Sequence, residues 1–323
     1  MGQLLNRWNG LTGRSDPLRF VDINLRGIGQ VMFQDNPISG LLFLVAIGWG
    51  SYASGVPQVA IGGLLAVVVA TLTAQWLRVD DAGLRSGLFG YNAFLVGIAL
   101  PTFLDVSPLL WVYIVIGAAV SVIAMRATAN VMGTWGVSAL TAPFVLVAWL
   151  LLLSVNAFTG IEGGALPSSG LIVPIAPEAS DPLRIGDFLS GILSSISQVF
   201  VKGDAPLALL ILAGLAVSSW AAAGFALAAA ILSVVVAHLL GAESQLITGG
   251  LHGFNPVLTA IALGTVLYRP GLRVALFALL GAVFTILAQG AMIAAMTPFA
   301  VPTLTASFVL ITWLFALARV HRD

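Results

Sequence analysis

The chain has 323 residues, of which 59% are hydrophobic and 8% are charged, and its formal net charge is zero. A soluble domain carries about 25% charged residues, so this composition favours a membrane protein and, without a basic face, excludes nucleic-acid binding. The absence of cysteine excludes disulfides, thiolate metal sites and thiol catalysis.

The first predicted element is a short helix that precedes the long apolar runs. The residues from Asp22 to Asn24 are expected to cap a helix over 23–34, and Asn36 with Pro37 is expected to begin the next helix. A bilayer needs about 20 apolar residues to be crossed, so this helix is too short. We expect a re-entrant half-helix; a surface amphipathic helix is the alternative.

Ten apolar runs of membrane-spanning length follow along the chain. They lack the alternation of barrel strands, which leaves helices as the way to satisfy the backbone in lipid. The predicted spans are 37–55, 56–77, 87–103, 107–125, 134–155, 205–221, 222–241, 250–267, 273–295 and 300–318. A second short segment, 188–201, precedes the sixth span and is also expected to be re-entrant.

Basic residues predict the orientation, because cytoplasmic loops collect Lys and Arg. With the N-terminus inside, the inside loops hold Arg7, Arg14, Arg19, Arg26, Arg78, Arg85, Arg126, Arg269, Arg273, Arg319 and Arg322. The predicted outside loops near 51–58, 102–107, 242–249 and 296–302 contain neither Lys nor Arg. The linker 156–187 holds Glu162, Glu178, Asp181 and Asp187 against Arg184. We therefore expect a multi-pass protein of the inner cell membrane with both termini cytoplasmic.

Two sequence motifs recur in the same order. GLFGYNAFLVGIALP at 87–101 shares eight of fifteen residues with GLHGFNPVLTAIALG at 250–264, and LTAPFVLVAWL at 140–150 shares eight of eleven with LTASFVLITWL at 304–314. An odd number of spans in each half means that the halves insert in opposite directions. We expect a first inverted repeat over 1–155, an external linker over 156–187 and a second repeat over 188–323, with a central pore between them.

The predicted spans carry few ionisable groups. A coupled transporter normally holds its ion or proton on a charged residue at membrane depth, and His238 and His252 are the candidates here. Neither belongs to a catalytic motif, and we predict no enzymatic activity. The pattern favours passive permeation of a neutral solute, with ion-coupled transport as the alternative.

The repeated segments supply aromatic rings, amides and hydroxyls instead of charges. Removing the water of a planar solute that is rich in N–H donors leaves unpaired donors, which costs several kcal/mol. Backbone carbonyls at the ends of broken helices could accept from these donors, and flat aromatic and Leu side chains could flank the two faces of the solute.

Together the segments GQVMF with Asn36-Pro37, the paired GYN and GFN motifs and the paired LTA motifs resemble the urea transporter family over residues 23–318. The resemblance implies facilitated diffusion of urea by a homotrimer in the lipid bilayer, with one pore in each subunit and no cofactor. Other small neutral solutes, such as ammonia, water or short amides, are the alternative. The pore residues that it implies are Gln30, Phe33, Tyr91, Leu95, Thr141, Gln198, Val199, Phe200, Val201, Phe254, Leu258 and Thr305.

The second short segment departs from this family pattern. It lacks the Asn-Pro pair, and either Val201 or, with a shift of one residue, Phe200 would be the counterpart of Phe33. Tyr91 also carries a hydroxyl where the family pattern has Phe. The sequence leaves both points open.

Overall fold

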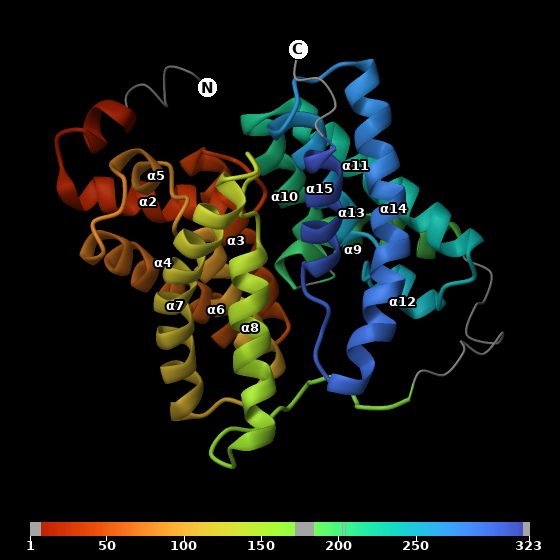
Figure 1. The fold of residues 1–323 in the computed structure, drawn as a ribbon, viewed down its shortest axis with the longest axis horizontal. Coiled ribbons are helices and arrows are strands. Elements are labelled where there is room, and N and C mark those ends of the chain that lie inside the picture. Colours follow the sequence, from red (N-terminus) through yellow and green to blue (C-terminus); the bar gives the residue numbers. More distant parts are fainter. Residues whose placement is uncertain (1–7, 172–183, 202, 204, 319–323) are drawn as a thin grey trace.

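A computed structural model describes residues 8–171, 184–201, 203 and 205–318. Within these ranges all regular structure is helical, as Figure 1 shows. Several residues named in the sequence analysis lie outside the described residues: Arg7, Arg319 and Arg322 of the orientation argument, Glu178 and Asp181 of the linker, and parts of 1–155, 156–187 and 188–323.

The helices fall into two series, one on each side of the linker. The first half consists of α2 (Asp16–Gln30), α3 (Pro37–Ala53), α4 (Gln58–Trp76), α5 (Asp81–Arg85), α6 (Tyr91–Phe103), α7 (Pro108–Gly133), α8 (Ala142–Ser154) and the short η1 (Val155–Ala157). The second half consists of α9 (Ile185–Ser197), η3 (Gln198–Phe200), α10 (Ala205–Ser218), α11 (Trp220–Leu239), α12 (Ser244–Thr248), α13 (Phe254–Ile261), η4 (Ala262–Val266), α14 (Leu272–Met296), η5 (Thr297–Phe299) and α15 (Ala306–Leu317).

Membrane-length helices alternate with shorter apolar helices. Among the described residues, four helical segments are long and apolar enough to cross a membrane: Gln58–Trp76, Pro108–Gly133, Trp220–Leu239 and Leu272–Phe299. The other predicted spans correspond to apolar helices of 10–17 residues. The all-helical prediction and the positions of the apolar segments are confirmed, while six of the ten predicted spans form shorter helices.

Two predicted span boundaries are wrong for a shared reason. The sequence predicts helix throughout 134–155, but α8 begins at Ala142, and the run 300–318 becomes helical only at Ala306 in α15. The preceding segments, 137–141 and 301–305, are non-helical although they are apolar. Hydropathy cannot distinguish them from helix, because their carbonyls are satisfied by distant parts of the chain rather than by the next turn.

The first short helix is also longer than predicted. It starts at Asp16 after Ser15, so Asp22 and Asn24 lie inside α2 instead of capping it. Asn36 does cap α3, because its side chain accepts a hydrogen bond from the Ile38 amide and Pro37 is the first helical residue. The turn that follows each short helix contains a residue with left-handed backbone, Phe33 with φ 63° after α2 and Val201 with φ 59° after η3.

Unusual backbone conformations recur at matching places in the two halves. Besides Phe33 and Val201, residues with positive φ form the pairs Arg78 and Gly241, Gly87 and Gly250, Gly136 and Ala300, and Leu140 and Leu304. Non-glycine residues rarely adopt this conformation, so the agreement reflects a shared architecture. In Figure 1, α7 and its counterpart α14 run in opposite directions along the long axes of the helices, as do α8 and α15.

Reciprocal hydrogen bonds join the two halves. Trp149 of α8 donates its indole N–H to the carbonyl of Pro302 at 2.9 Å, and Trp313 of α15 donates to the carbonyl of Ser138 at 2.9 Å. Each non-helical segment is therefore held by a Trp from the opposite half.

Candidate solute-binding site

The two non-helical segments each form the wall of a cavity. The first cavity has a volume of about 290 Å³. Its lining consists of Gln30, Phe33, Leu88, Tyr91, Met125, Ala129, Ser138, Ala139, Leu140, Ala262, Val266 and Leu267. Most of these residues come from the first half, and a π-helical turn that follows α13 closes the remaining side. Such turns are frequent at functional sites.

The second cavity is smaller, at about 70 Å³. It is lined by Leu95, Phe103, Phe144, Gln198, Val199, Val201, Leu251, Phe254, Pro302, Thr303, Leu304 and Thr305. The two linings correspond through the sequence repeat, for example Gln30 with Gln198 and Tyr91 with Phe254. None of the described lining residues of either cavity is Asp, Glu, Lys or Arg.

A pair of threonine hydroxyls connects the two linings. The Oγ1 atoms of Thr141 and Thr305 lie 2.6 Å apart and share one hydrogen bond, although the residues are 164 positions apart in the chain. Thr141 directly follows Leu140 of the first cavity, and Thr305 itself lines the second. One hydroxyl donates to the other, so the pair keeps a hydrogen for an additional acceptor.

Three of the aromatic residues singled out from the sequence, Phe33, Tyr91 and Phe254, line the two cavities. Phe33 packs edge-on against Phe308, with ring centroids 6.0 Å apart. Tyr91 lines the first cavity and Phe254 the second, each at the start of a helix, α6 and α13. An aromatic ring therefore lines each cavity at corresponding positions of the two motifs.

A hydrogen bond fixes the amide side chain of Gln30 in the lining of the first cavity. Gln30, at the end of α2, donates an amide hydrogen to the Ser86 carbonyl at 2.9 Å. This contact holds the side chain and leaves its Oε1 atom able to accept a hydrogen bond from a solute. Gln198 and Val199 take the corresponding place in the lining of the second cavity.

The structure answers which residue corresponds to Phe33. Val201 has the same left-handed backbone as Phe33 and lines the second cavity. Phe200 is fully buried and packs against Phe43 and Phe94, with centroid distances of 5.4 and 6.4 Å. The second mouth therefore has an aliphatic side chain where the first has an aromatic ring.

The two predicted leucines, Leu95 and Leu258, differ in their environments. Leu95 reaches the second cavity rather than the first, because α6 carries it across to the opposite half. Leu258 is as buried as Leu95, at 1% exposed, but lines neither cavity. Phe200 is likewise absent from both linings.

A network around two buried asparagines holds the non-helical segments of the cavity walls, and the sequence analysis did not predict it. Asn92 accepts a hydrogen bond from the Phe144 amide, and Asn255 accepts one from the Phe308 amide. Both side chains donate to a backbone carbonyl in the non-helical segment of their own half, Asn92 to that of Leu140 and Asn255 to that of Leu304. The sequence signal for this network was the Asn that follows Tyr91 in the first motif and Phe254 in the second.

Gln289 of α14 is a second supporting residue that the sequence analysis missed. Its Oε1 accepts hydrogen bonds from Asn255 at 2.7 Å and Ser307 at 2.8 Å, and its Nε2 donates to Thr303 at 3.0 Å. It is 1% exposed. An isolated Gln inside an otherwise apolar run was the sequence signal for this role.

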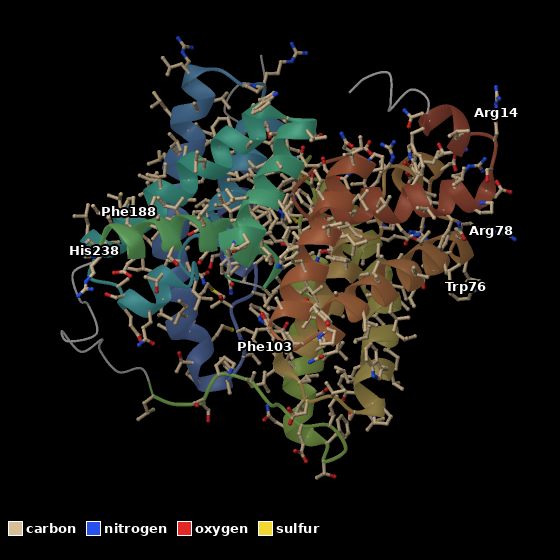
Figure 2. The ribbon with its side chains drawn as sticks, turned by 180° about the vertical axis from the view of Figure 1, so that it is seen from behind. Arg14, Trp76, Arg78, Phe103, Phe188 and His238 are labelled. Atoms are coloured by element: carbon tan, nitrogen blue, oxygen red, sulfur yellow. The ribbon has the colours of Figure 1, made fainter. Side chains whose placement is uncertain are left out.

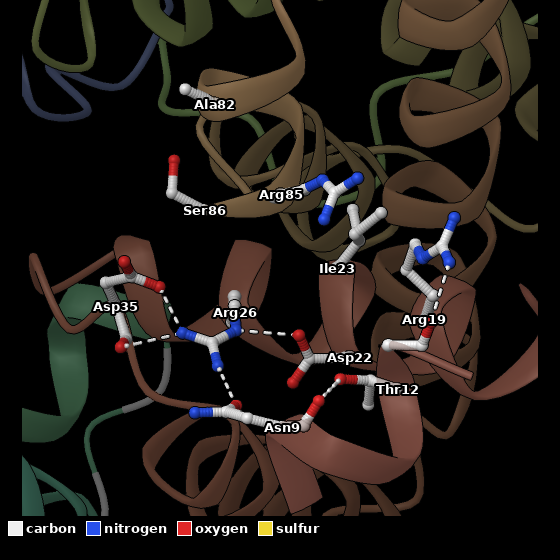
Figure 3. Close-up of a pocket in the computed structure, with 11 residues that line it drawn as sticks. Asn9, Thr12, Arg19, Asp22, Ile23, Arg26, Asp35, Ala82, Arg85 and Ser86 are labelled. Atoms are coloured by element: carbon white, nitrogen blue, oxygen red, sulfur yellow. Dashed lines mark hydrogen bonds and ion pairs between the residues drawn. The ribbon is translucent and has the colours of Figure 1, made fainter. Parts of the chain in front are cut away.

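A charged cluster lines a further cavity of about 370 Å³ in the first half. In Figure 3, Arg26 bridges Asp22, Asp35 and Asn9. The distances are 2.8 Å to Asp22, 2.7 Å to Asp35 and 3.1 Å to Asn9. Burial by itself would lower the pKa of Arg26, but its hydrogen bonds and charge interactions with both carboxylates raise the pKa above its ordinary value. The cluster ties the N-terminal segment and the Phe33 loop to α2.

The two histidine candidates line neither of the two cavities. His238 lies at the outer edge of the second half in Figure 2 and is absent from both cavity linings. His252 is 8% exposed and follows Leu251, which lines the second cavity, but it does not line that cavity itself.

Apolar helices of membrane length around small, uncharged cavities define a membrane protein that handles a small neutral solute. Comparison with known proteins identifies the family. The profile of the family described as "Urea transporter" matches residues 21–320. The proteins named urea transporter 1 from Capra hircus, Ovis aries and Rattus norvegicus are each 31% identical over 315 residues, covering 96% of this chain and 79% of theirs.

The chain therefore belongs to the urea transporter family, and it is a transporter rather than an enzyme. The family resemblance stated from the sequence motifs is confirmed.

Proposed function

We propose that this chain carries urea down its concentration gradient through an uncharged passage that joins the two cavities. Membership of the urea transporter family gives the solute. The observation that carries the passive mechanism is the pair of corresponding cavities, whose described lining residues bear no charge, with the Thr141–Thr305 pair between them. Coupling to an ion normally requires a charged residue at this depth.

The proposed permeation residues have three roles. Gln30, Gln198 and the two threonines bond the solute; Phe33, Tyr91, Val201, Phe254, Leu95 and Val199 flank its faces. Phe200 and Leu258, which line neither cavity, support the lining from behind. Carbonyls such as that of Leu304 supply further acceptors for the N–H groups of urea.

The proposed architecture is a pair of inverted repeats with ten membrane-embedded helices, two re-entrant half-helices, α2 and α9, and a central pore. It is supported by the repeated motifs, by the matching positive-φ positions and by the opposite directions of α7 and α14. The boundaries proposed for its parts are 1–155, 156–187 and 188–323.

We further propose a homotrimer in the inner cell membrane with both termini cytoplasmic. Exposed apolar side chains supply surface for lipid and neighbouring subunits, and they include Trp49, Tyr52, Leu150 and Leu276. Arg78, Arg85, Arg269 and Arg273 support the orientation through the excess of basic residues in cytoplasmic loops.

Liposomes test the proposed function directly. Vesicles containing the purified chain should shrink and re-swell rapidly after a step in external urea concentration, and collapsing the proton gradient should leave the rate unchanged. Rates equal to those of empty vesicles would reject urea transport. Uphill flux driven by a pH gradient would instead support ion coupling.

A solute panel in the same vesicles separates urea from the neutral alternatives. Ammonia, water and short amides are compared with urea at equal osmotic steps. A passage with acceptors along its wall should favour urea over an equally small solute that lacks N–H donors. Faster movement of ammonia or water than of urea would favour those alternatives.

A further inference from the structure

The two cavities differ in how their wall carbonyls are used, although the repeat gives each cavity the same carbonyl. In the first cavity the carbonyl oxygen of Leu140 accepts a hydrogen bond from the Tyr91 hydroxyl at 2.5 Å and lies 3.4 Å from the Asn92 amide nitrogen. A carbonyl oxygen has two lone pairs. Both lone pairs of Leu140 therefore have a donor within the protein.

The corresponding carbonyl in the second cavity has a spare lone pair. Leu304 accepts from the Asn255 amide at 3.1 Å. Phe254 stands where Tyr91 does in the first half and has no hydroxyl. Gln289, which takes the place of Met125, bonds Asn255, Ser307, Thr303 and the Leu251 carbonyl instead of Leu304. Within the part of the chain that the structure describes, no second donor to the Leu304 carbonyl is found.

We propose that Tyr91 sets the affinity of the first cavity for urea by occupying the Leu140 carbonyl. The Tyr91 hydroxyl hydrogen is committed to that carbonyl, so the side chain offers a solute its phenolic oxygen, a weaker acceptor. The first cavity therefore holds urea more weakly than it would with Phe at this position. This inference rests on the proposed urea path and names the residue that makes its two ends unequal.

Weak binding of urea in the first cavity is consistent with passive flux. A solute must bind well enough to enter a passage and loosely enough to leave it. The first cavity has an aromatic Phe33 and a fixed Gln30 at its mouth, whereas the second has Val201. Tyr91 offsets the additional contact that Phe33 provides, which keeps urea from being retained at the first mouth.

The test measures the occupancy of each cavity separately. Because the chain has no cysteine, a single Ala129→Cys substitution places one thiol in the first cavity, and Val266→Cys is a second reporter there. Bound urea should slow the modification of this thiol by a small methanethiosulfonate reagent in proteoliposomes. The urea concentration that halves the labelling rate reports binding in the first cavity.

Adding Tyr91→Phe to the reporter should lower the half-protecting urea concentration by about threefold to tenfold, the range expected for one released acceptor. Phe254→Tyr is the matched control and should leave protection in the first cavity unchanged. With Phe103→Cys as a reporter in the second cavity, Phe254→Tyr should instead raise the half-protecting concentration by a similar factor. The measurement in the second cavity does not require the Tyr91 variant to fold.

Equal half-protecting concentrations with and without the Tyr91→Phe substitution, or no protection by urea in either background, would overturn the proposal for Tyr91. Neither outcome affects the shrinkage assay of the reporter proteins, which tests urea transport itself. Transport without a difference in protection would reject the role of Tyr91 alone, whereas vesicles without urea flux would reject the proposed function.

Discussion

The two halves of this chain share matching positive-φ positions but differ in side-chain chemistry. The first half, residues 8–155, surrounds its cavity with Met125 and the Tyr91 hydroxyl, while the second half, residues 185–318, has Gln289 and Phe254 at the corresponding places. The first cavity is about 290 Å³ and the second about 70 Å³. A duplicated backbone can thus keep its shape while each copy acquires its own hydrogen-bonding pattern.

What the halves share is clearest at two glycines. Gly87 has φ 75°, and a Cβ atom there would overlap the Gly27 nitrogen; Gly250 has φ 76°, and its Cβ would overlap the Ser194 carbonyl carbon. Both clashes are with backbone, which cannot move aside easily. The crossing of the short helix with the next motif therefore depends on glycine in both halves.

Substituting either glycine should have the largest effect. Gly87→Ala and Gly250→Ala should each destabilise the protein by roughly 3 kcal/mol or more, seen as loss of monodisperse protein in detergent and a lower melting temperature. Gly48→Ala is the control, because a Cβ at Gly48 meets no atom within 4 Å. Normal behaviour of one variant and collapse of the other would show that the halves do not share this constraint.

Exchanging Gln289 and Met125 between the halves should have the next largest effect, and only the loss of Gln289 should destabilise the protein. Gln289→Met leaves the Ser307 and Thr303 hydroxyls and one amide hydrogen of Asn255 without their partner, so we expect a loss of about 2–3 kcal/mol in stability. Met125→Gln should be tolerated, because the Tyr91 hydroxyl and the Asn92 amide lie beside Met125 Sδ at 3.7 and 3.6 Å and can bond an amide. Thermal denaturation of both variants measures the difference, and equal melting temperatures would contradict it.

The charged cluster belongs to the first half, where Arg26 holds two carboxylates. Arg26→Met should destabilise the protein by about 2 kcal/mol, because Asp22 is largely buried and would lose its ion pair. Arg85→Met, which breaks an exposed ion pair with Asp81, should cost less than about 0.5 kcal/mol. Melting temperatures compare the two, and a larger fall for Arg85→Met would be inconsistent with a structural role for the cluster.

The smallest predicted effects concern Thr141 and Thr305, the pair in which each half contributes one hydroxyl. Thr141→Val and Thr305→Val should each slow urea flux by about threefold, and the double variant by about tenfold, since each removes one hydroxyl from the shared pair. Stopped-flow shrinkage of proteoliposomes gives the rates. Unchanged flux in the double variant would remove these hydroxyls from the permeation path.

The amino-acid sequence alone was enough to indicate that this protein lies in a lipid membrane and that its sequence motifs repeat. The low charge and long apolar runs indicate lipid, and the paired GYN, GFN and LTA motifs indicate two related halves, because composition and sequence identity are properties of the chain alone. The motifs also led to Tyr91, Phe254 and the two threonines. Asn36 and Pro37 predicted the start of α3 correctly, since a helix cap is a local interaction.

Long-range packing determined where apolar sequence stops being helix and which side chains reach the cavities. The segments before α8 and α15 are as apolar as helices, but distant partners satisfy their backbone: Trp149 and Trp313 from the opposite half, and Asn92 and Asn255 from the motif of their own half. The same packing places Val201 in the second cavity and Phe200 in the core. It also directs the Tyr91 hydroxyl to the Leu140 carbonyl. Such contacts join residues far apart in the chain, so periodicity and propensity, which act over a few residues, could not specify them.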